Sequence, residues 1–98
     1  MSVNEFMHSN MPEIRRIINE LPRPFDSHRF IQVFTQQFQL AYSEMLSTYP
    51  DSNEPFKIVH QQIARFLSEN QNTLGVAKQG KDKSLNIFGA ANENEVWL

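Results

Sequence analysis

Residues 27–49 read SHRFIQVFTQQFQLAYSEMLSTY and contain the most regular hydrophobic pattern of the 98-residue chain. Apolar residues recur every three or four positions and fall within an arc of ~120°, as on a helix with one buried face. They are Phe30, Ile31, Phe34, Phe38, Ala41, Tyr42, Met45 and Tyr49. Asp26 or Ser27 can cap the start of this helix, and Pro50 ends the pattern. The stretch therefore predicts one long helix over 27–49.

The opposite face of this predicted helix is almost uncharged. It carries several glutamines and serines, and Val33 and Leu40 add a minor apolar stripe that either the preceding helix or a partner would cover. A surface with so little charge is easily desolvated at an interface. One hypothesis is therefore a protein-interaction or homodimerisation surface, extended by an exposed side of Trp97. Its residues would be Gln32, Val33, Gln36, Leu40 and Ser43.

Two further helices are expected on either side of this stretch. Apolar residues at helical spacing between Pro12 and Pro22 predict a helix over 12–21, and residues 1–10, which lack periodicity, are expected to be a flexible arm. After the turn-rich segment PDSNE, a third helix is predicted over 55–69, with Pro55 in its first turn. Its buried residues would be Phe56, Val59, Ile63, Phe66 and Leu67.

From Thr73 the apolar period changes from helical spacing to two, which is typical of strands. The pattern predicts a β-hairpin with strands at 74–78 and 84–88 and a turn at 79–82, QGKD. Residues 96–98, Val-Trp-Leu, are expected to pack back as a short third strand or an anchored terminus. The sequence therefore predicts a single α+β, mainly α domain over 1–98.

The predicted order of three helices followed by a hairpin resembles the winged helix-turn-helix family, over about residues 12–88. In that family the third helix reads DNA and the hairpin, called the wing, contacts the phosphate backbone. The resemblance lies in the order of elements. It implies a nucleic-acid-binding role for the helix at 55–69 and the hairpin.

Composition and motifs argue against catalysis. The chain has no Cys, which excludes thiol chemistry and fits a cytoplasmic location. Residues 1–10 show no basic start followed by an apolar run, and no long apolar run follows, so we expect neither secretion nor membrane insertion. Gly75, Gly80 and Lys81 have phosphate-loop spacing, but a helix precedes them and a strand pattern follows. Three scattered histidines, His8, His28 and His60, suggest no metal site. We expect no enzyme activity, no metal, no cofactor and no membrane partner.

Charge is distributed unevenly along the chain, although its net value is −2. Residues 55–92 contain five basic residues opposed only by Glu69 and Asp82. On the helix at 55–69, Lys57, Gln61 and Arg65 share one edge. The resulting hypothesis is nucleic-acid binding through Lys57, Gln61, Arg65, Lys78, Lys81 and Lys83, with the hairpin lysines contacting phosphate. Such residues are also ordinary on a solvated surface, and this reading stays open.

Overall fold

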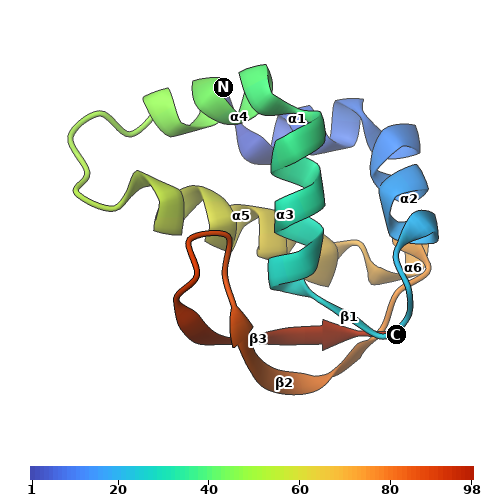
Figure 1. Cartoon of the computed structure of the whole chain (residues 1–98). Coiled ribbons are helices and arrows are strands. Elements are labelled where there is room, and N and C mark those ends of the chain that lie inside the picture. The colour runs from blue at the N-terminus through green and yellow to red at the C-terminus, as the bar shows by residue number, and fades with distance from the viewer.

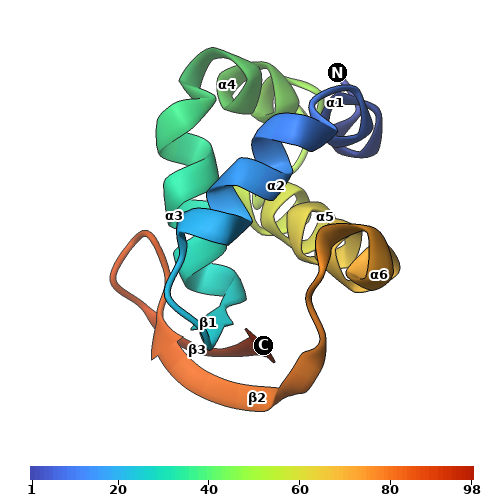
Figure 2. The same ribbon diagram turned by 90° about the vertical axis from the view of Figure 1, so that its right-hand side faces the viewer.

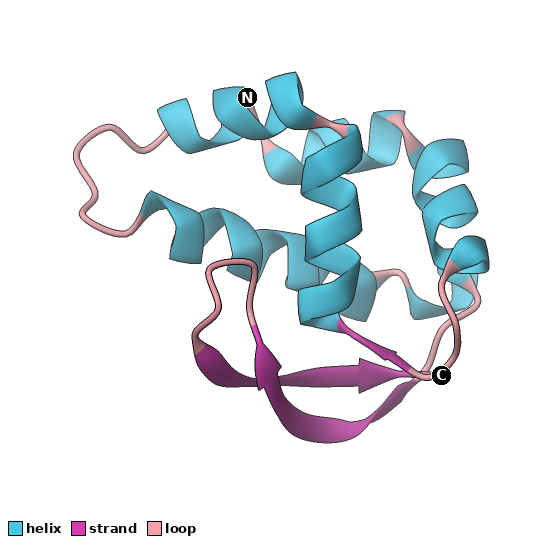
Figure 3. Ribbon diagram, in the orientation of Figure 1, coloured by secondary structure: helices cyan, strands magenta, loops and turns pink.

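Six helices and one antiparallel sheet make up the computed structural model, which describes residues 1–98 (Figure 1). The helices are α1 (Val3–Ser9), α2 (Met11–Glu20), α3 (Ser27–Gln37), α4 (Gln39–Ser47), α5 (Pro55–Glu69) and α6 (Gln71–Leu74). The strands are β1 (Phe25–Asp26), β2 (Lys78–Leu85) and β3 (Ala91–Trp97). The predicted α+β, mainly helical class is confirmed, whereas the number and bounds of several elements differ from the prediction (Figure 3).

Helices gather on one side of the sheet, and the core lies between them (Figure 2). Eighteen buried hydrophobic residues form one cluster, to which every helix and the strands β1 and β3 contribute. Helices α2, α3 and α5 supply most of it, as their hydrophobic patterns predict. The predicted helices at 12–21 and 55–69 are confirmed as α2 and α5.

The prediction of a flexible arm at residues 1–10 is wrong, because most of this segment is helix α1. Val3 and Met7, four positions apart, are both buried in the core. The hydroxyl of Ser2 accepts a hydrogen bond from the Glu5 amide at 3.3 Å and caps the helix. A helix of seven residues with two buried positions has too few repeats to reveal a period in the sequence.

The predicted long helix over 27–49 is also wrong in one respect, since it is divided at Phe38 into α3 and α4. Phe38 has φ −117° and ψ 53°, outside the helical region. Its ring lies 5.1 Å from the ring of Phe6 and 5.3 Å from that of Phe34, which holds the bend against the core. Val33 is half-buried against the core, and Leu40 is 76% exposed on the other helix. The two residues therefore do not form a single stripe.

The predicted hairpin bounds are wrong as well. Residues 71–74 form helix α6, which ends at Gly75 in the left-handed conformation. The predicted turn at 79–82 lies inside β2, where the register shifts between Lys78 and Gly80. The chain reverses instead at 86–90, where the side-chain oxygen of Asn86 accepts hydrogen bonds from the Phe88 and Ala90 amides. The winged-helix order of elements is therefore not reproduced in detail.

The C-terminal segment forms the central strand of the sheet, whose order is β1-β3-β2. Trp97 pairs with Phe25 on one side and with Lys78 on the other. Its indole is 1% exposed and donates a hydrogen bond from Nε1 to the Ser27 hydroxyl at 3.0 Å. Trp97 therefore has no exposed side that could extend an interaction surface. Of the two expectations for residues 96–98, the third strand is confirmed, and this strand is longer than predicted.

Candidate functional site

A groove of about 980 Å³ runs between helix α5 and the β2–β3 hairpin. Helix α5 forms one wall, and the two strands form the other. The first turn of α3 closes part of the floor through Ser27, His28 and Ile31. We call this concavity the α5–hairpin groove.

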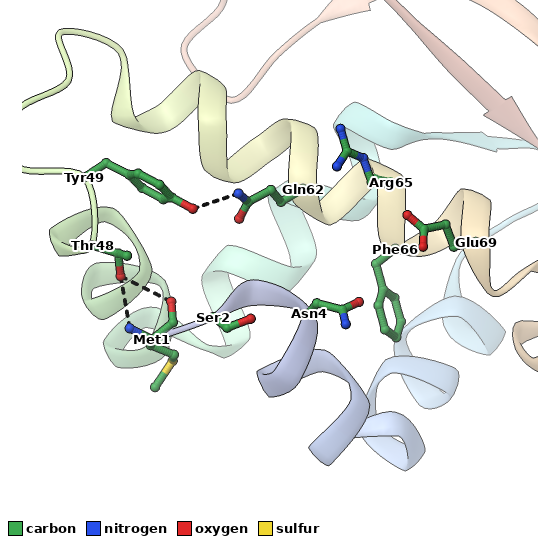
Figure 4. Close-up of a pocket in the computed structure, with 9 residues that line it drawn as sticks. All are labelled: Met1, Ser2, Asn4, Thr48, Tyr49, Gln62, Arg65, Phe66 and Glu69. Carbon is green, nitrogen blue, oxygen red and sulfur yellow. Dashed lines mark hydrogen bonds between the residues drawn. The ribbon is translucent and has the colours of Figure 1, made fainter.

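Five of the six residues of the nucleic-acid hypothesis line this groove. They are Lys57, Gln61 and Arg65 from α5 and Lys78 and Lys81 from β2. Lys83 does not line it. Arg65 takes part in no ion pair of the structure, and Figure 4 shows its guanidinium on the opposite side of α5 from Phe66. Lys57 and Arg65 of the helix therefore share one concavity with Lys78 and Lys81 of the hairpin, and Arg65 also lines a second, smaller hollow.

Carboxylates accompany these cations inside the groove. Glu54 lies 3.9 Å from the Lys57 ammonium, and Glu95 lies 3.9 Å from that of Lys78. Glu95 also stands opposite Lys81 in the strand register. Residues directly opposed across antiparallel strands have Cβ atoms ~4.5–5.5 Å apart and project from the same face of the sheet. The groove therefore carries charges of both signs.

These carboxylates lie outside residues 55–92, the segment in which basic residues outnumber acidic ones. Glu93 and Glu95 follow directly after residue 92, and Glu54 precedes residue 55. The strand register, which aligns Glu93 with Lys83, is not visible from the sequence because the turn lies at 86–90. Sequence reasoning missed Glu93 and Glu95 for that reason, whereas Glu54, three positions before Lys57, lies just outside the segment in which charges were counted.

Aromatic rings gather at one end of the groove, beside the 86–90 loop. The rings of Phe56 and Phe88 meet edge to face with centroids 4.8 Å apart, and His60 stacks on Phe88 at 6.0 Å. Phe56 is 42% exposed and Phe88 is 58% exposed. The prediction that Phe56 belongs to the buried stripe of its helix is therefore wrong. The two phenyl rings form an apolar rim at this end.

His60 connects this rim to the interior through Tyr42. The Tyr42 hydroxyl lies 2.6 Å from Nε2 of His60. Burial, together with the charge of His28, lowers the pKa of His60 from 6.5 to about 4. Burial raises the pKa of Tyr42 to about 12. A neutral His60 can therefore accept a hydrogen bond from the Tyr42 hydroxyl.

The lowered pKa of His60 predicts a loss of stability in mild acid. Between about pH 6.5, the ordinary value, and about pH 4, the unfolded chain binds more protons at this site than the folded chain does. The contribution of His60 to the free energy of unfolding is complete above pH 6.5 and declines as the pH falls towards 4. Because His60 is only half-buried, solvent screening reduces the expected loss between pH 7 and pH 5 to about 1 kcal/mol. Urea denaturation at the two pH values measures it.

The matched variant for this measurement is His60→Gln, which keeps a polar side chain and removes the titration. We expect its stability to change much less between pH 7 and pH 5 than that of the wild type. An equal loss in both proteins would show that other groups cause the acid sensitivity.

Comparison of the chain with protein-family models, curated proteins and solved structures gives no match. The groove must therefore be interpreted from its own chemistry.

Other parts of the surface are less suited to binding. A second hollow of about 440 Å³ lies where α1, α5 and the segment after α4 meet, and its walls are mostly polar (Figure 4). The N-terminal amine of Met1 donates to the Thr48 hydroxyl there, and Gln62 donates to the Tyr49 hydroxyl. No three His, Cys, Asp or Glu side chains lie close enough to hold a metal ion. None of the helices has the length and hydrophobicity needed to cross a membrane.

His28 contributes a ring at the floor of the groove. Its Nδ1 lies 2.7 Å from the Ser84 hydroxyl, and its backbone amide donates to the Asn94 side chain at 2.8 Å. Asp26, two residues earlier, accepts from the Arg29 amide and so caps α3. His28 thus joins the start of α3 to the hairpin, whereas Asp26 caps the helix.

The residues of the alternative interaction surface are spread over two helices. Gln32, Val33 and Gln36 belong to α3, whereas Leu40 and Ser43 follow the bend in α4. Neither hollow described above includes any of them. The single uncharged helical face on which that hypothesis depends is therefore interrupted at Phe38.

Proposed function

We propose that this chain is a protein-binding module whose α5–hairpin groove receives an extended segment of another protein. The observation that carries the proposal is the combination of side chains in the groove. Charges of both signs, several amides and two exposed phenyl rings line the same concavity. Such mixed chemistry matches a polypeptide, which offers apolar, charged and backbone groups together.

The charge balance supports a protein ligand over a nucleic acid. Among the lining residues, four bases (Lys57, Arg65, Lys78 and Lys81) face three acids (Glu54, Glu93 and Glu95). Every residue of a nucleic acid brings a phosphate, and affinity for it depends on clustered cations. Acids close to those cations weaken such binding. A peptide needs only one or two matching charges.

The shape of the site also bears on the winged-helix resemblance. In a winged helix, the third helix enters the major groove of DNA, so it must protrude from the domain. The polar face of α5 instead forms the wall of a groove and has the hairpin opposite it. Such a wall is better suited to enclosing a narrow chain than to entering a duplex.

Nucleic-acid binding is a second candidate function, favoured by the five predicted residues that share the groove. A titration of single-stranded and duplex oligonucleotides at two salt concentrations tests it. Affinity that falls steeply with salt, and is lost when Arg65 and Lys81 are changed to Gln, would favour this function over peptide binding.

Selection of random dodecamer peptides on the intact chain tests the proposed function. We expect Ala64→Trp, which fills the middle of the groove, to weaken selected peptides at least tenfold, or about 1.4 kcal/mol. Ala64 is half-buried, so urea denaturation must show that the variant is folded. Fluorescence anisotropy of labelled peptides gives the dissociation constants.

Gln36→Trp is the matched control, because it adds the same ring on α3 outside the groove. We expect it to leave peptide affinity unchanged. If Gln36→Trp weakens binding and Ala64→Trp does not, the binding surface is the glutamine-rich face of α3 and the groove assignment is wrong.

A further inference from the structure

The two ends of the α5–hairpin groove differ in chemistry. At one end the 86–90 loop touches the start of α5, and the exposed rings of Phe56 and Phe88 meet. The other end lies beside α6, where the Lys78 amide donates to the Gln71 side chain at 3.1 Å. Arg65 belongs to the part of α5 nearer this second end. The groove therefore has an aromatic end and a distinct opposite end.

Charge is unbalanced at the end beside α6. Arg65 has no ion-pair partner, and Lys78 and Lys81 share a single carboxylate, that of Glu95. At the aromatic end, Lys57 is already paired with Glu54. Among the residues that line the groove, positive charge without a paired carboxylate is thus concentrated around Arg65, and Glu69, one turn further along α5, lines the second hollow together with Arg65. An anionic group in the groove would be attracted to Arg65.

The spacing between the two ends can be expressed in peptide residues. Phe56 and Arg65 are nine positions apart on one helix, which corresponds to ~13 Å along its axis at 1.5 Å per residue and to about half a turn around it at 3.6 residues per turn. An extended peptide advances ~3.3 Å per residue, so about four residues cover the axial distance alone. The two side chains therefore stand at opposite edges of the α5 wall, and a ligand that crosses the groove between them would reach both with side chains at least about four positions apart.

From these observations we infer the class of segment that the groove takes. It is an extended stretch of a partner protein in which a large apolar side chain and an acidic side chain stand at least about four residues apart. The apolar side chain covers the rings of Phe56 and Phe88, and the carboxylate lies against Arg65. This inference rests on the proposed function and specifies its ligand.

A panel of synthetic dodecamer peptides tests the inference. Each peptide contains one Phe and one Glu in a background of Gly, Ser and Thr, with separations from one to seven residues in both orders. We expect the highest affinity at a separation of about four or more, a clear loss at separations of one to three, and at least a tenfold loss when Glu is replaced by Gln. Fluorescence anisotropy with the intact chain measures the dissociation constants.

A charge exchange identifies the residue that contacts the acid. We expect Arg65→Glu to weaken the best Glu peptide at least tenfold and to improve the matching Lys peptide. Arg15→Glu makes the same charge change at an exposed position of α2, so it should alter neither affinity. A double variant, Phe56→Ala with Phe88→Ala, should remove the preference for Phe over Ala in the peptide.

The outcomes separate this inference from the proposed function. Selected peptides that lose affinity with Ala64→Trp, yet show no preference for an acid or for any separation, would overturn the inference and leave the proposed function standing. Failure to select any peptide that depends on the groove would overturn both. A dodecamer of thymidine that binds more tightly than every peptide, with affinity that falls steeply with salt, would assign the groove to nucleic acid.

Discussion

Replacement of Trp97 by Ala is expected to lower the free energy of unfolding by about 4 kcal/mol, a large share of the ~5–15 kcal/mol typical of a domain. The indole is almost fully buried and belongs to the central strand of the sheet. Its loss leaves a cavity beside Phe25 and removes the hydrogen bond to Ser27. Urea denaturation followed by far-ultraviolet circular dichroism measures the effect, since the variant has no tryptophan left to fluoresce.

Trp97→Phe separates packing from hydrogen bonding. The phenyl ring retains most of the apolar contact, whereas Ser27 loses its donor, so we expect a loss of about 1–2 kcal/mol. A loss below 1 kcal/mol for Trp97→Ala would mean that β3 is not anchored through this side chain.

Met7→Ala is expected to lower the free energy of unfolding by about 3 kcal/mol. Met7 is completely buried in the core, and α1 packs against α5. Truncation removes the hydrophobic contact and leaves a cavity at this junction. The same urea denaturation measures the loss.

Ser9→Ala is the control for this variant, because Ser9 is exposed on the same short helix. We expect a change within about 0.5 kcal/mol, as is usual for surface substitutions. A flexible arm would make Met7→Ala and Ser9→Ala equally harmless. A difference of several kcal/mol between them would therefore verify that α1 is part of the core.

Helices with several repeats of the hydrophobic pattern were the predictable part of the fold. Helices α2 and α5 begin near a proline and place a mainly aliphatic face in the core, so local rules suffice for them. The division at Phe38 depends on packing against Phe6, which lies far away in the sequence. The pattern continues through the bend because both α3 and α4 bury apolar residues.

The sheet was less predictable because its pairing is not local. QGKD at 79–82 has the composition of a turn, yet β2 continues through it with a shift in register. The reversal at 86–90 depends on the side chain of Asn86 as an acceptor for two loop amides. Gly89, whose φ is +80°, also serves this reversal, but Asn86 and Gly89 are separated by two large apolar residues, whereas QGKD is a continuous polar segment with a glycine.

The basic residues of the candidate site could be predicted from the sequence, but the acidic residues that lie beside them could not. The helical spacing of Lys57, Gln61 and Arg65 correctly indicates that they share one edge of a helix. The carboxylates opposite the hairpin lysines follow only from the strand register. The aromatic rim was missed because Phe56 fits the period of the buried face, although its place in the first turn of α5 leaves it beside Phe88.

The central position of β3 has a consequence for the kinetics of folding. Its contact with β2 is local, whereas Trp97 and Ser27 are 70 positions apart in the sequence. Closing so long a loop costs chain entropy before any contact compensates for it, and such contacts slow folding. The hairpin can therefore form early, while docking of its second strand beside β1 completes the molecule. Because Trp97 becomes buried only at that step, its fluorescence should report the slowest phase of refolding.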